Sequence, residues 1–471
     1  MNVLRKILPV AVAGLLAASC AVGPDYKKPD VAPLTPGEWS WTPAHPRDAA
    51  PKGSWWEIFQ DPVLNEMETN AVVRSQTARA GLARVEQARA TARLSRSQLF
   101  PELDAAPTVN RQLSSGNLPT PIPFHIPAAR YDTFSMPLDL SYEIDVWGRV
   151  RRGFEGVRAT AQATAADYQN VVLTLTADVA VDYFLLRSQD AQIRALTRRA
   201  AARGETSRLL RARLQAGAIA EVDVAQAEAD AAAARSDLTD MIRQRAETLH
   251  ALALLSGAPA SSFTLAEASL PAPPPEPPAD LPAMVLERRP DIASAERNVA
   301  SKSAQIGVAK GGYFPVISLT AQGGYLSSSA DKLFAGDSRV WSIGPSVSLP
   351  IFNGGRTSAE VKQAVAGLDE AVANYRQAVL TAFKEVEDSL AQIRRRGEQE
   401  TEAARAVEAA RRGEELARAR QAAGETTHLP VSDAERTLRQ QELLQAQVRG
   451  EHYAAVVRLI KALGGGWSAK P

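Results

Sequence analysis

The chain lacks the residues and motifs on which most enzymes, metalloproteins and nucleic-acid-binding proteins depend. Its single cysteine excludes an intramolecular disulfide bond. Lysine and arginine number 54 against 53 aspartates and glutamates, and a net charge of +1 is too small for a nucleic-acid-binding protein. The five histidines show no metal-ligand spacing, and no phosphate-binding loop, H-E-x-x-H or G-x-S-x-G motif occurs. We therefore expect no catalytic residue, no metal ion, no cofactor and no nucleic-acid partner.

Long apolar runs are also missing, apart from one at the N-terminus. Ile7–Ala18 is apolar and follows two basic residues, which is typical of a secretory signal peptide over residues 1–19. The run is too short for a transmembrane anchor. Cys20 follows small residues, and this resembles the lipobox of bacterial lipoproteins, in which the cysteine becomes the acylated first residue. An incidental cysteine after an ordinary signal peptide is the alternative. Ala21, in place of aspartate, favours the outer membrane by resemblance to bacterial sorting rules.

Two stretches alternate between apolar and polar residues. In Ser135–Trp147 every second residue from Met136 to Val146 is apolar, and the residues between are polar apart from Pro137. Such alternation is typical of a strand with one apolar and one polar face. Trp341–Phe352 repeats this pattern, and two further stretches alternate more loosely. We predict four strands, at about 102–113, 131–147, 315–326 and 340–352.

The rest of the chain favours helices. Asp61-Pro62 is a good helix start, because aspartate caps helix N-termini and proline suits the first turn, and no further proline occurs before Leu99. Residues 149–258 contain no proline and are rich in helix-forming residues. We expect a helical hairpin there that turns near Gly217, and a second hairpin of the same kind that turns near Gly424.

The two halves of the chain repeat one another. Gly148-Arg149 matches Gly355-Arg356, and Gly217 matches Gly424, both at an offset of 207 residues. The repeating unit is a helix, two strands and a long helical hairpin. We expect the following segments: a signal peptide over 1–19, an extended lipid-anchored segment over 20–60, a first repeat over 61–256, a proline-rich linker over 257–282, a second repeat over 283–463 and a tail over 464–471.

Four strands cannot close a membrane barrel alone, because such barrels need about eight or more. Either the sheet is soluble and helices of the same chain cover one face, or several chains share one barrel. A shared barrel of about twelve strands is water-filled and needs a polar inner face. The candidates for that face are Asp139, Ser141, Glu143, Asp145, Ser346 and Ser348. They favour a shared barrel with Met136, Leu138, Leu140, Tyr142, Ile144 and Val146 toward lipid; an ordinary solvated sheet face is the alternative.

Several short motifs resemble one family. They are C-A-V-G-P-D-Y from Cys20, Trp55-Trp56 with Phe59 and Asp61-Pro62, R-R-P-D from Arg288 with Ala295-Glu296, and the two glycine-containing turns. Together they resemble the bacterial outer membrane factors, the TolC-like efflux channels, and especially their OprM/NodT-like lipoprotein branch. The resemblance implies a mainly α fold with a small β part. It implies a homotrimer with an outer-membrane β-barrel of about twelve strands, continued by a periplasmic α-helical barrel.

The same resemblance implies a passive exit duct for small molecules such as drugs or toxic compounds. Substrate would come from an inner-membrane pump, expected to be of the RND type, through a periplasmic adaptor protein. The duct would lie in the outer membrane of a Gram-negative bacterium and carry a covalent lipid on Cys20. By motif matching, Leu429 corresponds to a hydrophobic constriction residue of a periplasmic gate, Asp433 to the aspartate ring just beside it, and Asp223 to a gate aspartate on the first hairpin. Gly217 and Gly424 match the turns that meet the adaptor.

Alternatives remain for the gate and for the function. A three-fold ring of aspartates would concentrate negative potential, but Asp223 and Asp433 also suit helix N-terminal positions through the helix dipole. The same fold would also serve a type I protein secretion system. A third reading is a structural periplasmic lipoprotein with a coiled coil and no channel.

Overall fold

The computed structural model describes residues 21–29, 54–117, 127–270, 274–275, 288–426 and 428–465. Cys20 and the predicted signal peptide lie outside these residues. Contacts divide the chain into two compact units, the first formed by residues 1–29, 86–164 and 295–375 and the second by 30–85, 165–294 and 376–471. Each unit contains parts of both sequence repeats.

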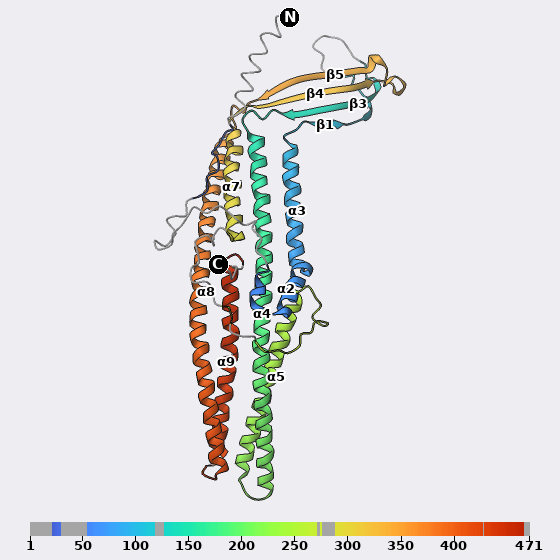
Figure 1. Cartoon of the computed structure of the whole chain (residues 1–471). Helices are drawn as coiled ribbons and strands as arrows, with labels where there is room; N and C mark the ends of the chain where they lie inside the picture. The colour runs from blue at the N-terminus through green and yellow to red at the C-terminus, as the bar shows by residue number, and fades with distance from the viewer. Residues whose placement is uncertain are drawn as a thin grey trace. The chain divides into compact units, whose positions relative to one another are not determined.

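The chain is mainly helical with one small sheet, which confirms the predicted fold class (Figure 1). The helices are η3 (Trp55–Phe59), α2 (Pro62–Arg74), α3 (Gln76–Ser97), α4 (Arg149–Gln215), α5 (Glu221–Leu255), α7 (Pro290–Gly311), η4 (Ala330–Lys332), η5 (Gly336–Ser338), α8 (Arg356–Ala422) and α9 (His428–Ala462). The strands are β1 (Glu102–Ala105), β2 (Thr108–Leu113), β3 (Arg130–Glu143), β4 (Val316–Ser327) and β5 (Arg339–Ser348). No described helix carries a stretch long and apolar enough to cross a membrane.

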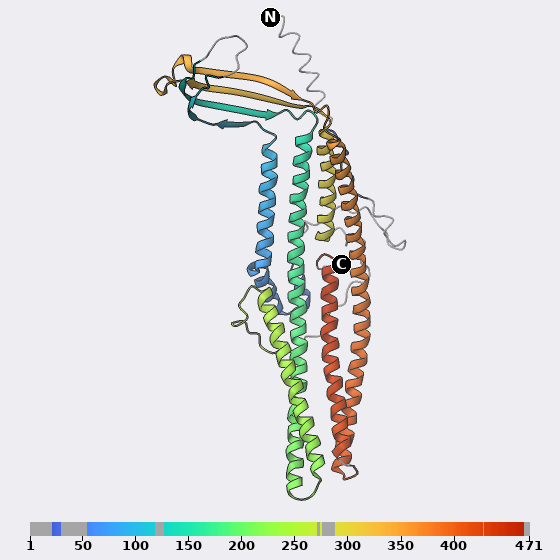
Figure 2. The same cartoon turned by 180° about the vertical axis from the view of Figure 1, so that it is seen from behind.

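The internal repeat fixes the helix boundaries. Helices α4 and α8 both have 67 residues, α5 and α9 both have 35, and each pair begins and ends at an offset of 207 residues. Figure 2 shows α5 returning beside α4 and α9 beside α8. Gly217 and Gly424 lie at the hairpin turns with φ of 72° and 77°. Glycine is the residue that adopts such φ values at little cost.

The first helical segment is interrupted once. Asp61 caps α2, since its carboxylate accepts hydrogen bonds from the backbone N–H of Val63 (2.9 Å) and Leu64 (3.2 Å). The helix does not continue to residue 99 but breaks at Ser75, which has an extended ψ of 127°. Gly257, just after α5, lies against this break: a Cβ at Gly257 would be 2.5 Å from the carbonyl oxygen of Arg74. Packing between elements that are distant in sequence therefore accompanies the break.

The second unit has an aromatic core to which η3 contributes. Trp55 and Phe59 are buried in η3, so this part of residues 20–60 is a 3-10 helix rather than extended chain. Phe59 packs on Phe184 with ring centroids 4.8 Å apart, and Phe184 packs on Tyr453 at 4.4 Å. Trp55 Nε1 donates to Thr176 Oγ1 at 3.2 Å. Burial of these large side chains supplies most of the driving force for docking η3.

The first half of the predicted linker is bound to the second unit. Asp190 of α4 is fully buried and accepts hydrogen bonds from Arg187, Arg245 and the backbone N–H of Ala268. The two arginines also donate to the carbonyl oxygens of Ala266 (2.6 Å) and Leu265 (3.0 Å). A buried carboxylate with two guanidinium partners therefore holds residues 265–268 in place.

The sheet belongs to the first unit and is antiparallel throughout, in the order β1-β3-β4-β5, with β2 also paired to β3. The predicted strand at 102–113 is interrupted between β1 and β2 at Ala106-Pro107, where proline has no N–H for the ladder. Because β1 and β2 follow one another along the same edge of β3, the sheet has four strand positions. The predicted strands at 131–147 and 340–352 end earlier, at Glu143 and Ser348.

Candidate functional site

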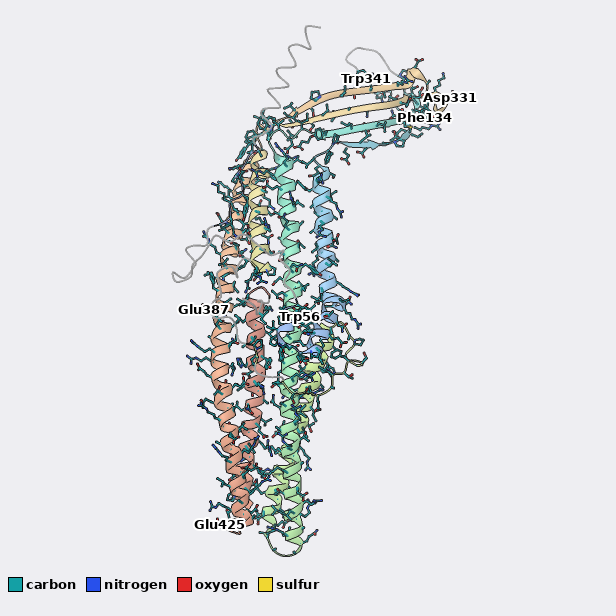
Figure 3. All side chains as sticks on the ribbon, in the orientation of Figure 1. Trp56, Phe134, Asp331, Trp341, Glu387 and Glu425 are labelled. Carbon is teal, nitrogen blue, oxygen red and sulfur yellow. The ribbon has the colours of Figure 1, made fainter. Side chains whose placement is uncertain are left out.

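The register of the sheet separates an apolar face from a polar face. One row across the sheet joins Leu103, Leu140, Ala321 and Ile343, and the next row on the same face joins Ala105, Leu138, Gly323 and Trp341. Several side chains of this face are exposed, among them 79% of Trp341, which Figure 3 labels on the sheet, and 64% of Ile343. An apolar surface of this size in contact with water is unusual for a soluble sheet and marks an interaction surface.

The opposite face of the sheet is polar and acidic. The row between the two apolar rows joins Asp104, Asp139, Gln322 and Ser342. Gln322 Nε2 donates to Asp139 Oδ1 at 2.7 Å, which links β4 to β3 on this face. Glu102, Ser141 and Thr320 form the next polar row. Asp139 and Ser141 thus lie on the face that the alternation predicts.

The described residues leave the apolar face uncovered and the edges unpaired. Within the first unit, no described helix lies across the sheet in either view (Figures 1 and 2). Among the described strands, β1 and β2 have a partner only on the β3 side, and β5 only on the β4 side. A soluble sheet with its apolar face under helices of the same chain, which was one of the two alternatives, therefore does not match this arrangement.

One polar-face assignment is corrected by the structure. Asp145 lies beyond the end of β3, and its carboxylate accepts hydrogen bonds from the backbone N–H of Val150 (3.2 Å) and Arg151 (2.8 Å) at the start of α4. It is a helix-capping residue, because those N–H groups have no partner within the helix. Glu143, the last residue of β3, is in an ion pair with Arg149 at 2.5 Å.

The two hairpin turns have the same hydrogen-bond pattern. The N–H of Ala218 donates to the carbonyl oxygen of Arg213 at 2.9 Å, and the N–H of Glu425 donates to that of Arg420 at 2.9 Å. Figure 3 labels Glu425 at the turn between α8 and α9. A Cβ at Gly217 or Gly424 would meet nothing within 4 Å. Gly217 and Gly424 are both exposed to solvent.

The predicted gate residues lie on the return helices just after these turns. Leu429 is the second residue of α9 and is 69% exposed, and Asp433 follows one turn later, in an exposed ion pair with Arg436 at 3.3 Å. Asp223 lies in the first turn of α5. No hydrogen bond or ion pair joins Asp223 to Asp433 within the described part of the chain. The position of Asp223, in the first turn of α5, fits the helix-dipole interpretation, whereas Asp433 lies beyond the first turn of α9 and does not fit it.

Two residues near the predicted gate residues were not anticipated from the sequence. Val222 is the counterpart of Leu429 at the offset of 207 residues, and it is equally exposed at 69%. The internal repeat contains the signal that would have found it. Arg203 of α4 is buried and binds Ser432 of α9 through both the side-chain hydroxyl and the carbonyl oxygen, the latter at 2.9 Å. The first hairpin thus holds the start of α9, which no local pattern reveals.

Within the described residues, no group of three or more histidine, cysteine, aspartate or glutamate side chains is arranged to hold a metal ion. The features of the candidate site are a two-faced sheet with open edges and two glycine turns, with an exposed apolar residue after each turn.

Comparison with known proteins places these features in one family. The family model for outer membrane efflux proteins matches residues 69–258 and 281–465. The chain is 34% identical to the pyoverdine export outer membrane protein OpmQ of Pseudomonas aeruginosa, and the match covers 98% of each chain. It is also 34% identical to the toluene efflux pump outer membrane protein TtgI of Pseudomonas putida, again over 98% of each.

Solved structures agree with this placement. The outer-membrane channel OprN superposes with a TM-score of 0.84 at 29% identity, covering 95% of this chain and 100% of that one. The CmeC outer membrane channel of Campylobacter jejuni superposes with a TM-score of 0.87 at 25% identity, covering 96% of each chain.

Proposed function

We propose, because the chain belongs to the outer membrane efflux protein family, that three copies of it close one exit duct for small molecules. The chain is the outer-membrane channel component of an efflux system. The finer statements are our proposals: the trimer, the lipid on Cys20, an RND-type inner-membrane pump, a periplasmic adaptor at the Gly217 and Gly424 turns, and a gate at Leu429, Asp433 and Asp223. Relatives are named for pyoverdine and toluene, and we propose that this chain also exports small molecules.

The two-faced sheet with open edges is the observation that carries the proposal. The sheet has four strand positions, and each strand runs antiparallel to its neighbour, so β5 runs opposite to β1. When β5 of one copy pairs with β1 of the next copy, the new pair is therefore also antiparallel, and the whole ring is an antiparallel barrel. In lipid an open edge would leave backbone groups unpaired at a cost of several kcal/mol each. Closure also places every apolar row outward and every acidic row inward, toward water.

The proposed ring is tested by disulfide trapping between copies. One partner cysteine replaces Leu103 on β1, and the other is placed in turn at Trp341, Ile343 or Val347 on β5. A closed ring gives a covalent ladder that ends at three chains. The control pair, Leu140→Cys with Ala321→Cys, joins register partners on β3 and β4 and stays within one chain. A ladder that stops at two chains would contradict the proposal.

The transport function is tested separately. Purified protein in a planar bilayer should conduct ions, and a deletion strain should become more susceptible to drugs or solvents. Unchanged susceptibility together with the loss of a secreted protein would instead favour the type I secretion alternative. Covalent trimers without any conductance would favour the structural lipoprotein.

The gate proposal is supported by the exposure and repetition of its apolar residues. Leu429 and Val222 occupy the same position of the two return helices, and both are exposed although they are apolar. In a trimer they would supply six apolar side chains to one constriction. Asp433 would add a ring of carboxylates beside it, which favours cations over anions.

A further inference from the structure

The segment Ala21–Lys28, which we call the N-terminal strap, is bound to helices of the first unit. Its N-terminal end contacts the junction of β3 and α4: the N–H of Val22 donates to the carbonyl oxygen of Trp147 at 2.9 Å. Ala21 lies against Gly148, where a Cβ would be 2.8 Å from that of Ala21. Gly148 has a φ of 78°, so glycine is needed there for both conformation and space.

A glycine-to-glycine contact holds the middle of the N-terminal strap on α7. Gly23 has a φ of 113°, and a Cβ on it would lie 2.6 Å from Cα of Gly307. A Cβ on Gly307 would in turn lie 2.8 Å from the carbonyl oxygen of Val22 and 2.8 Å from Cγ of Arg152. Real Cβ atoms do not approach other atoms this closely. The contact therefore requires glycine on both sides.

Polar contacts complete the docking. Asp25 Oδ1 accepts from Arg152 Nη2 of α4 at 2.6 Å, and Arg152 is itself buried. The Tyr26 hydroxyl donates to Glu296 Oε1 of α7 at 3.0 Å, and Lys28 Nζ is 3.9 Å from the other oxygen of that buried carboxylate. Gly23, Asp25 and Tyr26, identified from sequence only as part of a family motif, thus have binding partners. They join α4 of the first repeat to α7 of the second.

The docked position also determines where the N-terminus emerges. Ala21, the first described residue, lies at the junction itself. At that junction Trp147 stacks on Phe314 with centroids 4.8 Å apart, and Trp147 Nε1 donates to the carbonyl oxygen of Pro315. Tryptophan is enriched at membrane–water interfaces. A lipid on Cys20 would therefore enter the bilayer beside the end of the sheet.

We propose that the N-terminal strap is a docking element that fixes the acylated N-terminus at the β3–α4 junction. Helices α4 and α7 keep it there, whether or not a lipid is attached. The position of the lipid rests on the acylation proposed above, whereas the docking itself does not. Acylation then supplies membrane affinity at the β3–α4 junction, because the docked strap holds the residue next to the acylated cysteine against the helices.

The test measures trypsin cleavage after Lys27 in the full-length trimer, followed by mass spectrometry. The next bond, Lys28-Pro29, resists trypsin, so a single cleavage reports on the N-terminal strap. Gly23→Ala and Gly307→Ala each insert a methyl group into the glycine contact, and we expect cleavage to accelerate at least about tenfold. Gly153→Ala is the matched control, because its Cβ would come no closer than 4.0 Å to the Val308 side chain.

A second experiment tests whether the helices or the membrane-bound lipid keep the N-terminal strap in place. The chain is exported with an ordinary cleavable signal peptide, so that the mature protein begins at Ala21 and carries no lipid. We expect its cleavage rate to stay within about twofold of the acylated protein. Wild-type cleavage rates in both glycine variants would overturn the proposal, and so would rapid cleavage of the non-acylated protein.

Folding and channel function are checked on the same samples. Gly23 belongs to the strap and to no helix, so its replacement leaves the helices intact even if Gly307→Ala disturbs α7. Trimer mobility on gels and bilayer conductance are recorded for every variant. Loss of conductance in wild-type protein would contradict the proposed function and leave the docking result untouched.

Discussion

Glu68 offers the sharpest test of the structure. It lies on α2 in the second unit with 0% of its surface exposed, and neither carboxylate oxygen has a hydrogen-bond partner in the described part of the chain. This burial raises the pKa of Glu68 from 4.5 to about 9. The carboxyl group is therefore protonated at neutral pH in the folded protein and ionised in the unfolded chain.

The size of the effect follows from the pKa difference. Between pH 4.5 and about pH 9 the folded chain holds a proton that the unfolded chain has lost, so the free energy of unfolding falls as pH rises. The loss is absent below pH 4.5, and it amounts to about 1.4 kcal/mol per pH unit. From pH 5 to pH 8 the stability should decrease by about 4 kcal/mol per chain. Glu68→Gln keeps the shape and removes the titration, so this decrease should vanish.

The assay compares wild type and Glu68→Gln at pH 5, 6.5 and 8 by hydrogen exchange of the α2 amides and by thermal unfolding midpoints. The free energy of unfolding of Glu68→Gln should increase relative to that of the wild type steadily as pH rises. Glu66→Gln on the same helix is the control for the amide substitution itself, since Glu66 is exposed. A difference between wild type and Glu68→Gln that stays constant from pH 5 to pH 8 would refute the reasoning.

Three further predictions concern the sheet, the second unit and the gate. Leu140→Arg should reduce the heat-resistant trimer seen on gels, at a cost of about 2–4 kcal/mol for a charge facing lipid, whereas Asp139→Asn should not; equal behaviour would contradict the assigned faces. Asp190→Ala should lower the thermal midpoint by removing the buried partner of two arginines, a loss of about 3–5 kcal/mol, and an unchanged midpoint would contradict its structural role. Leu429→Ala and Val222→Ala should each raise the resting conductance in planar bilayers, and the double variant should raise it further; unchanged conductance would argue against the gate.

The parts of the fold that depend on local stereochemistry were predictable. Proline stops, alternating strands and glycine turns each act within a few residues. The match between Gly217 and Gly424 therefore located both hairpins. The same locality explains the shortened strands. Alternation continues past Glu143, but Asp145 caps α4 instead of extending the ladder.

The parts of the candidate site that occur in both sequence repeats were predictable. Leu429 came from family resemblance, and the offset of 207 residues would have added Val222. Arg203 has no such signal, because its partner Ser432 is 229 residues away and lies on another helix. Gate, adaptor and lipid assignments stay predictions that the experiments above address.

The sequence alone determined the helical hairpins, the duplicated unit and the alternation that gives the sheet two faces, because backbone preferences and side-chain periodicity are local. Only the tertiary structure decided which groups are buried together. It enclosed Glu68 without a partner, surrounded Asp190 with two arginines and laid Gly23 against Gly307. Most of these contacts depend on close packing between separate segments of the chain, and local sequence preferences carry no record of that geometry.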